Sequence, residues 1–336
     1  MDAKLSTGDT LSAEDQELVD GLLAGKRRPL AKTITLIEST LLAHQQRARK
    51  VVASILPHTG RAIRVGISGV PGAGKSTFIE VLGIWLIEHG HKLAILAVDP
   101  SSSLSGGSIL GDKTRMEMLC QHEEAFIRPS PSAGSLGGVA AKTREAMLAC
   151  EAAGYDVILV ETVGVGQSET TVAGMVDMFT LLQLPNQGDE LQAIKKGIVE
   201  IADLVAINKV DLNPHHAAVC IAQWKQALHM LRPTSPNWTV PVVGLSALNR
   251  IGVDEFWGAI EKFHETMTKT GELEQKRRNQ ALAWMWSMIE GGLKQFFRND
   301  PRVEAELPKV AQQVSQGQIT PGAASEKLLD YVRQKS

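Results

Sequence analysis

The chain has 336 residues, with 35 Lys plus Arg against 37 Asp plus Glu, so its formal net charge is −2. This length suits either one large α/β domain with extensions or roughly two domains. The near balance of charge gives no electrostatic footprint for nucleic acid or for an acidic membrane surface. A hydrophobic fraction of 43% with 21% charged residues excludes a disordered chain.

Targeting signals and metal-binding cysteines are not evident in the sequence. The longest apolar runs fall far short of the roughly 18 residues that a membrane span needs. No apolar segment follows Met1, and the first 20 residues are too acidic for a transit peptide. Cys120, Cys150 and Cys220 lie far apart, which argues against a disulfide framework and a thiolate zinc site. We therefore expect a cytoplasmic protein without a membrane partner.

Residues 1–60 predict an N-terminal helical arm. Ser12 and Asp15 fit a capping box, in which the serine caps the helix and the acid reaches back. Apolar residues then recur at helical spacing, and Pro29 interrupts the pattern before it restarts. A third helix is expected over residues 42–55, ending near Pro57 and Gly60.

Residues 61–265 alternate short apolar runs with helical stretches. The runs are apolar on both faces, as in buried parallel strands, and the alternation predicts a doubly wound α/β layer. The expected strands cover residues 63–67, 93–98, 157–160, 178–182, 204–207 and 240–243.

Residues 266–336 predict a C-terminal helical arm. One apolar stripe steps by three or four residues through Leu282, Met285, Ile289, Leu293 and Phe296. Such a stripe is too apolar for a lone exposed helix, so we expect it to be buried in a homodimer.

A GxxxxGK[ST] motif follows the first expected strand and precedes a helix. Its glycines let successive backbone N–H groups converge on phosphates, and the helix N-terminus beyond them favours anions. Lys75 would reach the β- and γ-phosphate oxygens, and Ser76 would offer its hydroxyl to Mg²⁺. The expected nucleotide-binding residues are Gly69, Val70, Pro71, Gly72, Ala73, Gly74, Lys75, Ser76 and Thr77.

The tetrapeptide that begins at Asn208 follows another buried strand and predicts guanine recognition. Asp211 can accept hydrogen bonds from N1–H and the exocyclic amine of guanine, a donor pair that adenine lacks. Asn208 would tie this segment to the phosphate loop, and the stem of Lys209 would cover the base. The tripeptide Ser246, Ala247 and Leu248 fits the second base-binding loop. GTP and GDP are therefore the expected ligands.

Three carboxylates are candidates for magnesium binding and, with Lys75, for catalysis. Asp99 and Glu161 follow expected strands, whose carboxyl ends meet near Ser76 in a parallel sheet. N-capping of the next helix is the alternative for both. Asp112 is the third candidate, with a solvated loop acid as its alternative. Val165 stands where many GTPases place the glutamine that orients water, so we expect slow intrinsic hydrolysis.

Five segments together resemble the MeaB/ArgK/MMAA family, the GTPase chaperones of adenosylcobalamin-dependent methylmalonyl-CoA mutase. They are residues 69–80, 98–102, 106–116, 161–169 and 188–197. The resemblance implies a SIMIBI-type P-loop fold with helical arms and a C-terminal dimer contact. It implies a protein that gates cofactor loading into the mutase and protects it. Lys75, Ser76, Asp99, Asp112 and Glu161 fall on the family's nucleotide and magnesium positions.

The resemblance also implies a loop that couples the GTPase to the mutase, over residues 188–196. Asp189, Gln192 and Lys195 would transmit the signal within it. Two other functions stay open: a P-loop kinase of the arginine/ornithine transport type, and a nickel-insertase-like metallochaperone. The partner could equally be an isobutyryl-CoA or ethylmalonyl-CoA mutase.

Overall fold

The computed structural model describes residues 11–98, 116–129, 136–162, 168–185, 196–231 and 234–333. The strands are β1 Ile63–Gly69, β2 Leu93–Val98, β3 Ala125–Arg128, β4 Val157–Thr162, β5 Met178–Gln183, β6 Leu204–Ile207 and β7 Val242–Gly244. The helices up to the sheet's last strand are α1 Ala13–Leu23, α2 Arg27–Glu38, α3 Leu42–Ile55, α4 Lys75–Glu88, α6 Leu136–Ala152, α7 Ser168–Ala173, α8 Lys196–Glu200 and α9 Pro214–His229. After it come α10 Val253–Lys269, α11 Glu272–Arg298, α12 Pro301–Ser315 and α13 Pro321–Arg333; short 3₁₀ turns are η1 Leu56–His58 and η3 Leu119–Gln121.

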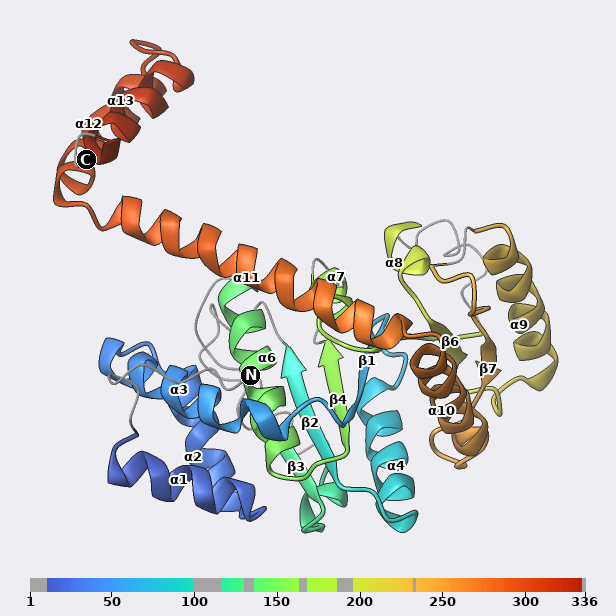
Figure 1. Cartoon of the computed structure of the whole chain (residues 1–336). Helices are drawn as coiled ribbons and strands as arrows, with labels where there is room; N and C mark the ends of the chain where they lie inside the picture. Colours follow the sequence, from blue (N-terminus) through green and yellow to red (C-terminus); the bar gives the residue numbers. More distant parts are fainter. Residues whose placement is uncertain are drawn as a thin grey trace. The chain divides into compact units, whose positions relative to one another are not determined.

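The described strands form one seven-stranded sheet in the order β3-β2-β4-β1-β5-β6-β7 (Figure 1). Each of the recorded strand pairs is parallel. Parallel strands need crossovers, and helices supply them on both faces. The predicted α/β class with a parallel sheet is thus confirmed. None of the described helices is long and apolar enough to cross a membrane.

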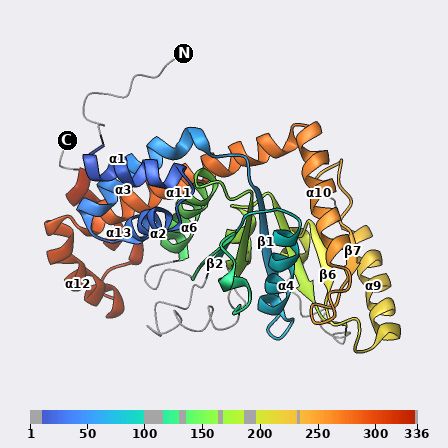
Figure 2. The same cartoon turned by 90° about the horizontal axis from the view of Figure 1, so that it is seen from below.

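Alternate residues of the strands feed two separate cores, one on each face. In β2, Leu93 and Ile95 pack with Phe78 of α4, whereas Leu96 packs with Ala149 of α6. Since successive side chains of a strand point to opposite faces, α4 and α6 cover opposite sides of the sheet. Figure 2 shows these two helices on either side of the central strands.

All six predicted strands are present, two with the predicted ends and four with altered ends, and one strand was missed. The first strand runs on to Gly69, and β4 runs on to Thr162, which places Glu161 inside the strand. N-capping is therefore the wrong reading of Glu161. The last strand is Val242–Gly244 rather than 240–243. The unpredicted β3 has only four residues and pairs with β2 alone, so its sequence carries almost no period.

The N-terminal helices pack on α6 and share its core. The hydroxyl of Ser12 accepts a hydrogen bond from the backbone N–H of Asp15 at 3.1 Å, as a helix cap should. The Asp15 carboxylate accepts a bond from the Ser12 hydroxyl and is held by Arg47 of α3. This arginine lowers the pKa of Asp15. The cap is thus as predicted, but the acid also ties α1 to α3.

The chain divides into two compact units, residues 1–277 and 278–336, and α11 belongs to both. In the second unit, α12 and α13 pack through Val310, Ala324 and Leu328. The predicted apolar stripe is exposed in the single chain; its five side chains are Leu282, Met285, Ile289, Leu293 and Phe296, each 40–63% exposed.

Candidate nucleotide-binding site

The predicted phosphate loop connects β1 to α4, and two of its glycines are required by close packing. A Cβ atom on Gly69 would lie 2.2 Å from the carbonyl oxygen of Leu182 in β5. Gly74 has φ +85° and is the N-cap of α4, where a Cβ would lie 2.8 Å from Nδ2 of Asn208. The loop is therefore held between its neighbouring strand and the segment that follows β6.

Lys75, Ser76 and Glu161 meet at the start of α4. The Ser76 hydroxyl donates to Oε1 of Glu161 at 3.3 Å, across 85 residues of sequence. Lys75 Nζ donates to the carbonyl oxygen of Gly69 at 2.7 Å. Burial lowers the pKa of Lys75, while the carboxylates of Glu161 and Glu169 oppose that shift. A cation and two oxygen ligands thus share one partly desolvated site, which suits phosphates with a divalent ion.

Asn208 links three loops. Its Nδ2 donates to the carbonyl oxygen of Ala73 at 2.8 Å, so it ties the segment after β6 to the phosphate loop. Its Oδ1 accepts the backbone N–H groups of Lys209 at 2.8 Å and Ala247 at 3.1 Å. Its side chain is fully buried, at 1% exposure. The predicted link between the loops is therefore present, and it includes the second base loop.

The side chains around this link are those predicted to hold the guanine base. Lys209 has φ +61° and its Nζ donates to the carbonyl oxygen of Gly72, so its stem spans the gap between the two loops. Ser246 and Ala247 are buried, whereas Leu248 is 81% exposed. Asp211, two residues after Lys209, is half-buried. A left-handed lysine is strained, and such strain is maintained where surrounding contacts fix it.

Several predicted site residues lie outside the described residues, namely Asp99, Asp112, Asp189, Gln192 and Lys195. Val165, at the position of the water-orienting glutamine, lies outside them too. One buried acid was missed by the sequence reading: Glu169 is 2% exposed, and its charge favours the protonated form of Lys75. Glu169 and the preceding Ser168 end the 161–169 segment and had no assigned role.

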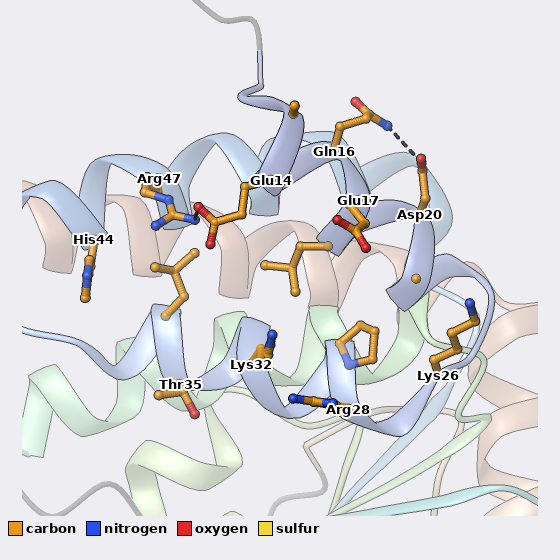
Figure 3. Close-up of a pocket in the computed structure, with 15 residues that line it drawn as sticks. Glu14, Gln16, Glu17, Asp20, Lys26, Arg28, Lys32, Thr35, His44 and Arg47 are labelled. Carbon is orange, nitrogen blue, oxygen red and sulfur yellow. Dashed lines mark hydrogen bonds and ion pairs between the residues drawn. The ribbon is translucent and has the colours of Figure 1, made fainter.

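A wide cavity in the described part of the chain lies elsewhere, between α1, α2 and α3. It has a volume of about 1050 Å³ and contains none of the predicted nucleotide residues. Figure 3 shows acidic side chains of α1 facing basic side chains of α2 across it. Its charged walls are exposed, as expected of a solvated groove between helices.

A phosphate loop after β1, a buried Asn208 that joins it to two further loops, and a parallel sheet together define a P-loop GTPase. Comparison with known proteins supports the same class of protein. The family model described as methylmalonyl Co-A mutase-associated GTPase MeaB matches residues 30–302. The chain belongs to this MeaB family of GTPases.

Individual relatives agree with the family match. The GTPase ArgK of Escherichia coli K12 is 50% identical over 276 residues, covering 82% of this chain and 83% of that protein. The mouse mitochondrial methylmalonic aciduria type A homolog is 46% identical, covering 95% and 80% respectively. A crystal structure described as an LAO/AO transport system kinase has TM-score 0.77 and 38% identity, covering 96% and 99%. The expected family and GTPase activity are thus confirmed.

Proposed function

We propose that this GTPase is a chaperone of an adenosylcobalamin-dependent acyl-CoA mutase of the methylmalonyl-CoA type. It would assist cofactor loading and protect the mutase. The observation that carries this proposal is the match of the mutase-associated GTPase family to residues 30–302. The mouse relative, named for methylmalonic aciduria, supports the same partner.

Within this function, GTP and Mg²⁺ would occupy the site at the carboxyl ends of β1, β4 and β6. The loop from Gly69 to Thr77 would hold the phosphates, and Asp211 would hold guanine. Oxygen ligands at Ser76 and Glu161, 3.3 Å apart, fit a hard cation. Asp99 and Asp112 would complete the magnesium site.

The mutase would accelerate hydrolysis by acting on the coupling loop, through Asp189, Gln192 and Lys195. Val165 stands in place of the water-orienting glutamine and leaves the positioning of water incomplete. The family resemblance supplies the loop as the element that would complete the site. For binding free energies the coupling is reciprocal: if the mutase favours the GTP-bound protein, GTP must favour the complex.

GTP turnover with and without purified mutase tests the partner and the loop together. We expect low basal turnover and marked stimulation, with Lys195→Ala keeping the basal rate and losing most of the stimulation. Lys225→Ala on the exposed face of α9 is the matched control and should respond as the parent does. Absent stimulation by methylmalonyl-, isobutyryl- and ethylmalonyl-CoA mutases would refute the partner. Full stimulation of Lys195→Ala would refute only the loop.

We further propose that the exposed stripe of α11 is buried in a homodimer. Five large apolar side chains at helical spacing on one helix are a costly surface in water. Light scattering at micromolar concentration should give twice the chain mass. Leu293→Glu and Phe296→Glu together should give the monomer mass, whereas Lys262→Glu on the exposed face of α10 should not. A monomeric parent would refute the dimer.

A kinase remains the second candidate, because one relative is described as a transport system kinase. The linkage of Asn208 to the phosphate loop supports a guanine-type site, whereas most kinases use ATP. Calorimetry with GDP and ADP distinguishes the two, and equal affinity would favour the kinase.

A further inference from the structure

Two consecutive side chains at the start of α11 bind the amino ends of three adjacent strands. These side chains are Lys276 and Arg277, and the strands are β1, β5 and β6, which neighbour one another in the sheet. The predicted nucleotide loops lie at the opposite, carboxyl ends of the same strands. We call Lys276 and Arg277 the α11 clamp.

Arg277 joins the beginnings of β1 and β5. Its Nε and Nη2 donate to the two carboxylate oxygens of Asp177 at 2.7 and 2.6 Å, a bidentate pair. Its remaining donors reach the backbone carbonyl oxygens of Gly60 at 2.5 Å and Ala62 at 2.7 Å, just before β1. The Asp177 carboxylate, 1% exposed, also accepts the backbone N–H of Arg64 in β1. One buried ion pair thus fixes where β1 and β5 begin.

Lys276 joins the beginnings of β5 and β6. Its Nζ donates to the carbonyl oxygen of Asp177 at 2.6 Å and to Oδ2 of Asp203 at 3.3 Å. Asp203 directly precedes β6, and its carboxylate also accepts the backbone N–H of Phe179 in β5 at 2.9 Å. The indole N–H of Trp238 donates to the Asp203 carbonyl oxygen. Burial raises the pKa of Asp203, and Lys276 opposes that shift.

The carboxyl ends of these strands tolerate little relative movement. Gly69, at the end of β1, already lies so close to Leu182 of β5 that a Cβ would not fit. The backbone N–H of Asn208, directly after β6, donates to the carbonyl oxygen of Gln183 at the end of β5. A strand of four to seven residues is only about 13–23 Å long, so a shift at one end is carried to the other.

We propose that Lys276 and Arg277 are positioning residues for the guanine nucleotide site, because they hold β1, β5 and β6 in axial register from the side opposite the nucleotide. The inference rests on the proposed nucleotide site. The phosphate loop, the segment after β5 and the base loop each take their place from a strand that the clamp holds. Small displacements matter at such sites, since a misplacement of about 1 Å can lower an enzyme's rate about 100-fold.

GDP affinity of full-length variants, measured by calorimetry, tests the clamp. We expect Arg277→Ala to weaken GDP binding by about tenfold or more, and Lys276→Met by a smaller factor. Arg277→Lys keeps the charge but cannot form the bidentate pair, so its affinity should fall between those of the parent and Arg277→Ala. The matched control is Lys269→Met, which removes an exposed lysine of α10 paired with the exposed Glu265; its affinity should stay within about twofold of the parent's.

Circular dichroism and thermal unfolding without nucleotide separate positioning from stability. Affinities are compared at a temperature where every variant is folded. Lower melting temperatures with unchanged GDP affinity in the folded Arg277 and Lys276 variants would overturn the inference. If Arg277→Ala does not fold, Arg277→Lys and Lys276→Met decide the question. A parent that binds no GDP would instead overturn the nucleotide site itself, and with it the inference.

Discussion

Replacing Asp211 with Asn is expected to weaken GDP binding by about 100-fold and to shift the preference toward xanthine nucleotides. The carboxylate would accept two hydrogen bonds from guanine, and the amide offers donors in place of an acceptor. Xanthine carries an oxygen where guanine carries its amine, so the amide would match it. The surrounding loop should not change, because Asn208 and Lys209 hold it through contacts that do not involve Asp211.

Calorimetry with GDP, XDP and ADP measures this switch. Glu261→Gln, on an exposed face of α10, is the matched control for losing one acidic charge and should bind GDP as the parent does. An Asp211→Asn protein that binds GDP as tightly as the parent would remove this residue from base recognition.

Replacing Lys75 with Ala is expected to lower GTP hydrolysis by about 1000-fold, because the loop would lose the cation that meets the phosphate charge. The fold should not suffer. Burial lowers the pKa of Lys75 despite the opposing carboxylates of Glu161 and Glu169, so on balance the folded protein disfavours the charged lysine, and we expect its removal to cost little stability. The hydrolysis rate should therefore fall, while the melting temperature stays the same or rises.

Single-turnover hydrolysis and thermal unfolding of Lys75→Ala measure the two effects. Lys225→Ala serves as the control for losing an exposed lysine. A variant that retains hydrolysis within about tenfold of the parent would argue against this role for the lysine. A large fall in melting temperature would show instead that Lys75 supports the fold.

The candidate nucleotide site could be predicted from the sequence because its chemistry is carried by short contiguous motifs. Gly69 to Ser76 and Asn208 to Asp211 each follow a strongly apolar strand, and parallel strands bring such ends together. The meeting of Ser76 with Glu161 could be expected for the same reason, although Glu161 lies within β4 rather than after it. The apolar runs likewise predicted six of the described strands.

Other features depend on contacts that no local pattern encodes. The edge strand β3 has four residues and one neighbour, so neither its length nor its period marks it. Glutamate is a common residue type, so the sequence does not single out Glu169. Only its burial and its charge interaction with Lys75 indicate a role. Lys276 and Arg277 read as ordinary charges of a polar helix, and their buried partners lie 73 to 100 residues away.

The α11 clamp sets the minimum length for a shortened version of this GTPase that lacks the C-terminal helical arm. A protein cut at residue 265, where the strand–helix alternation ends, would keep Asp177 and Asp203 buried but lose both of their cations. Removing one partner of a buried ion pair typically costs about 3–5 kcal/mol, a large share of a domain's stability. A protein that ends a few residues beyond Arg277 keeps both pairs and omits the apolar stripe. Expression of an arm-free GTPase for crystallisation or inhibitor screening should therefore begin from that length.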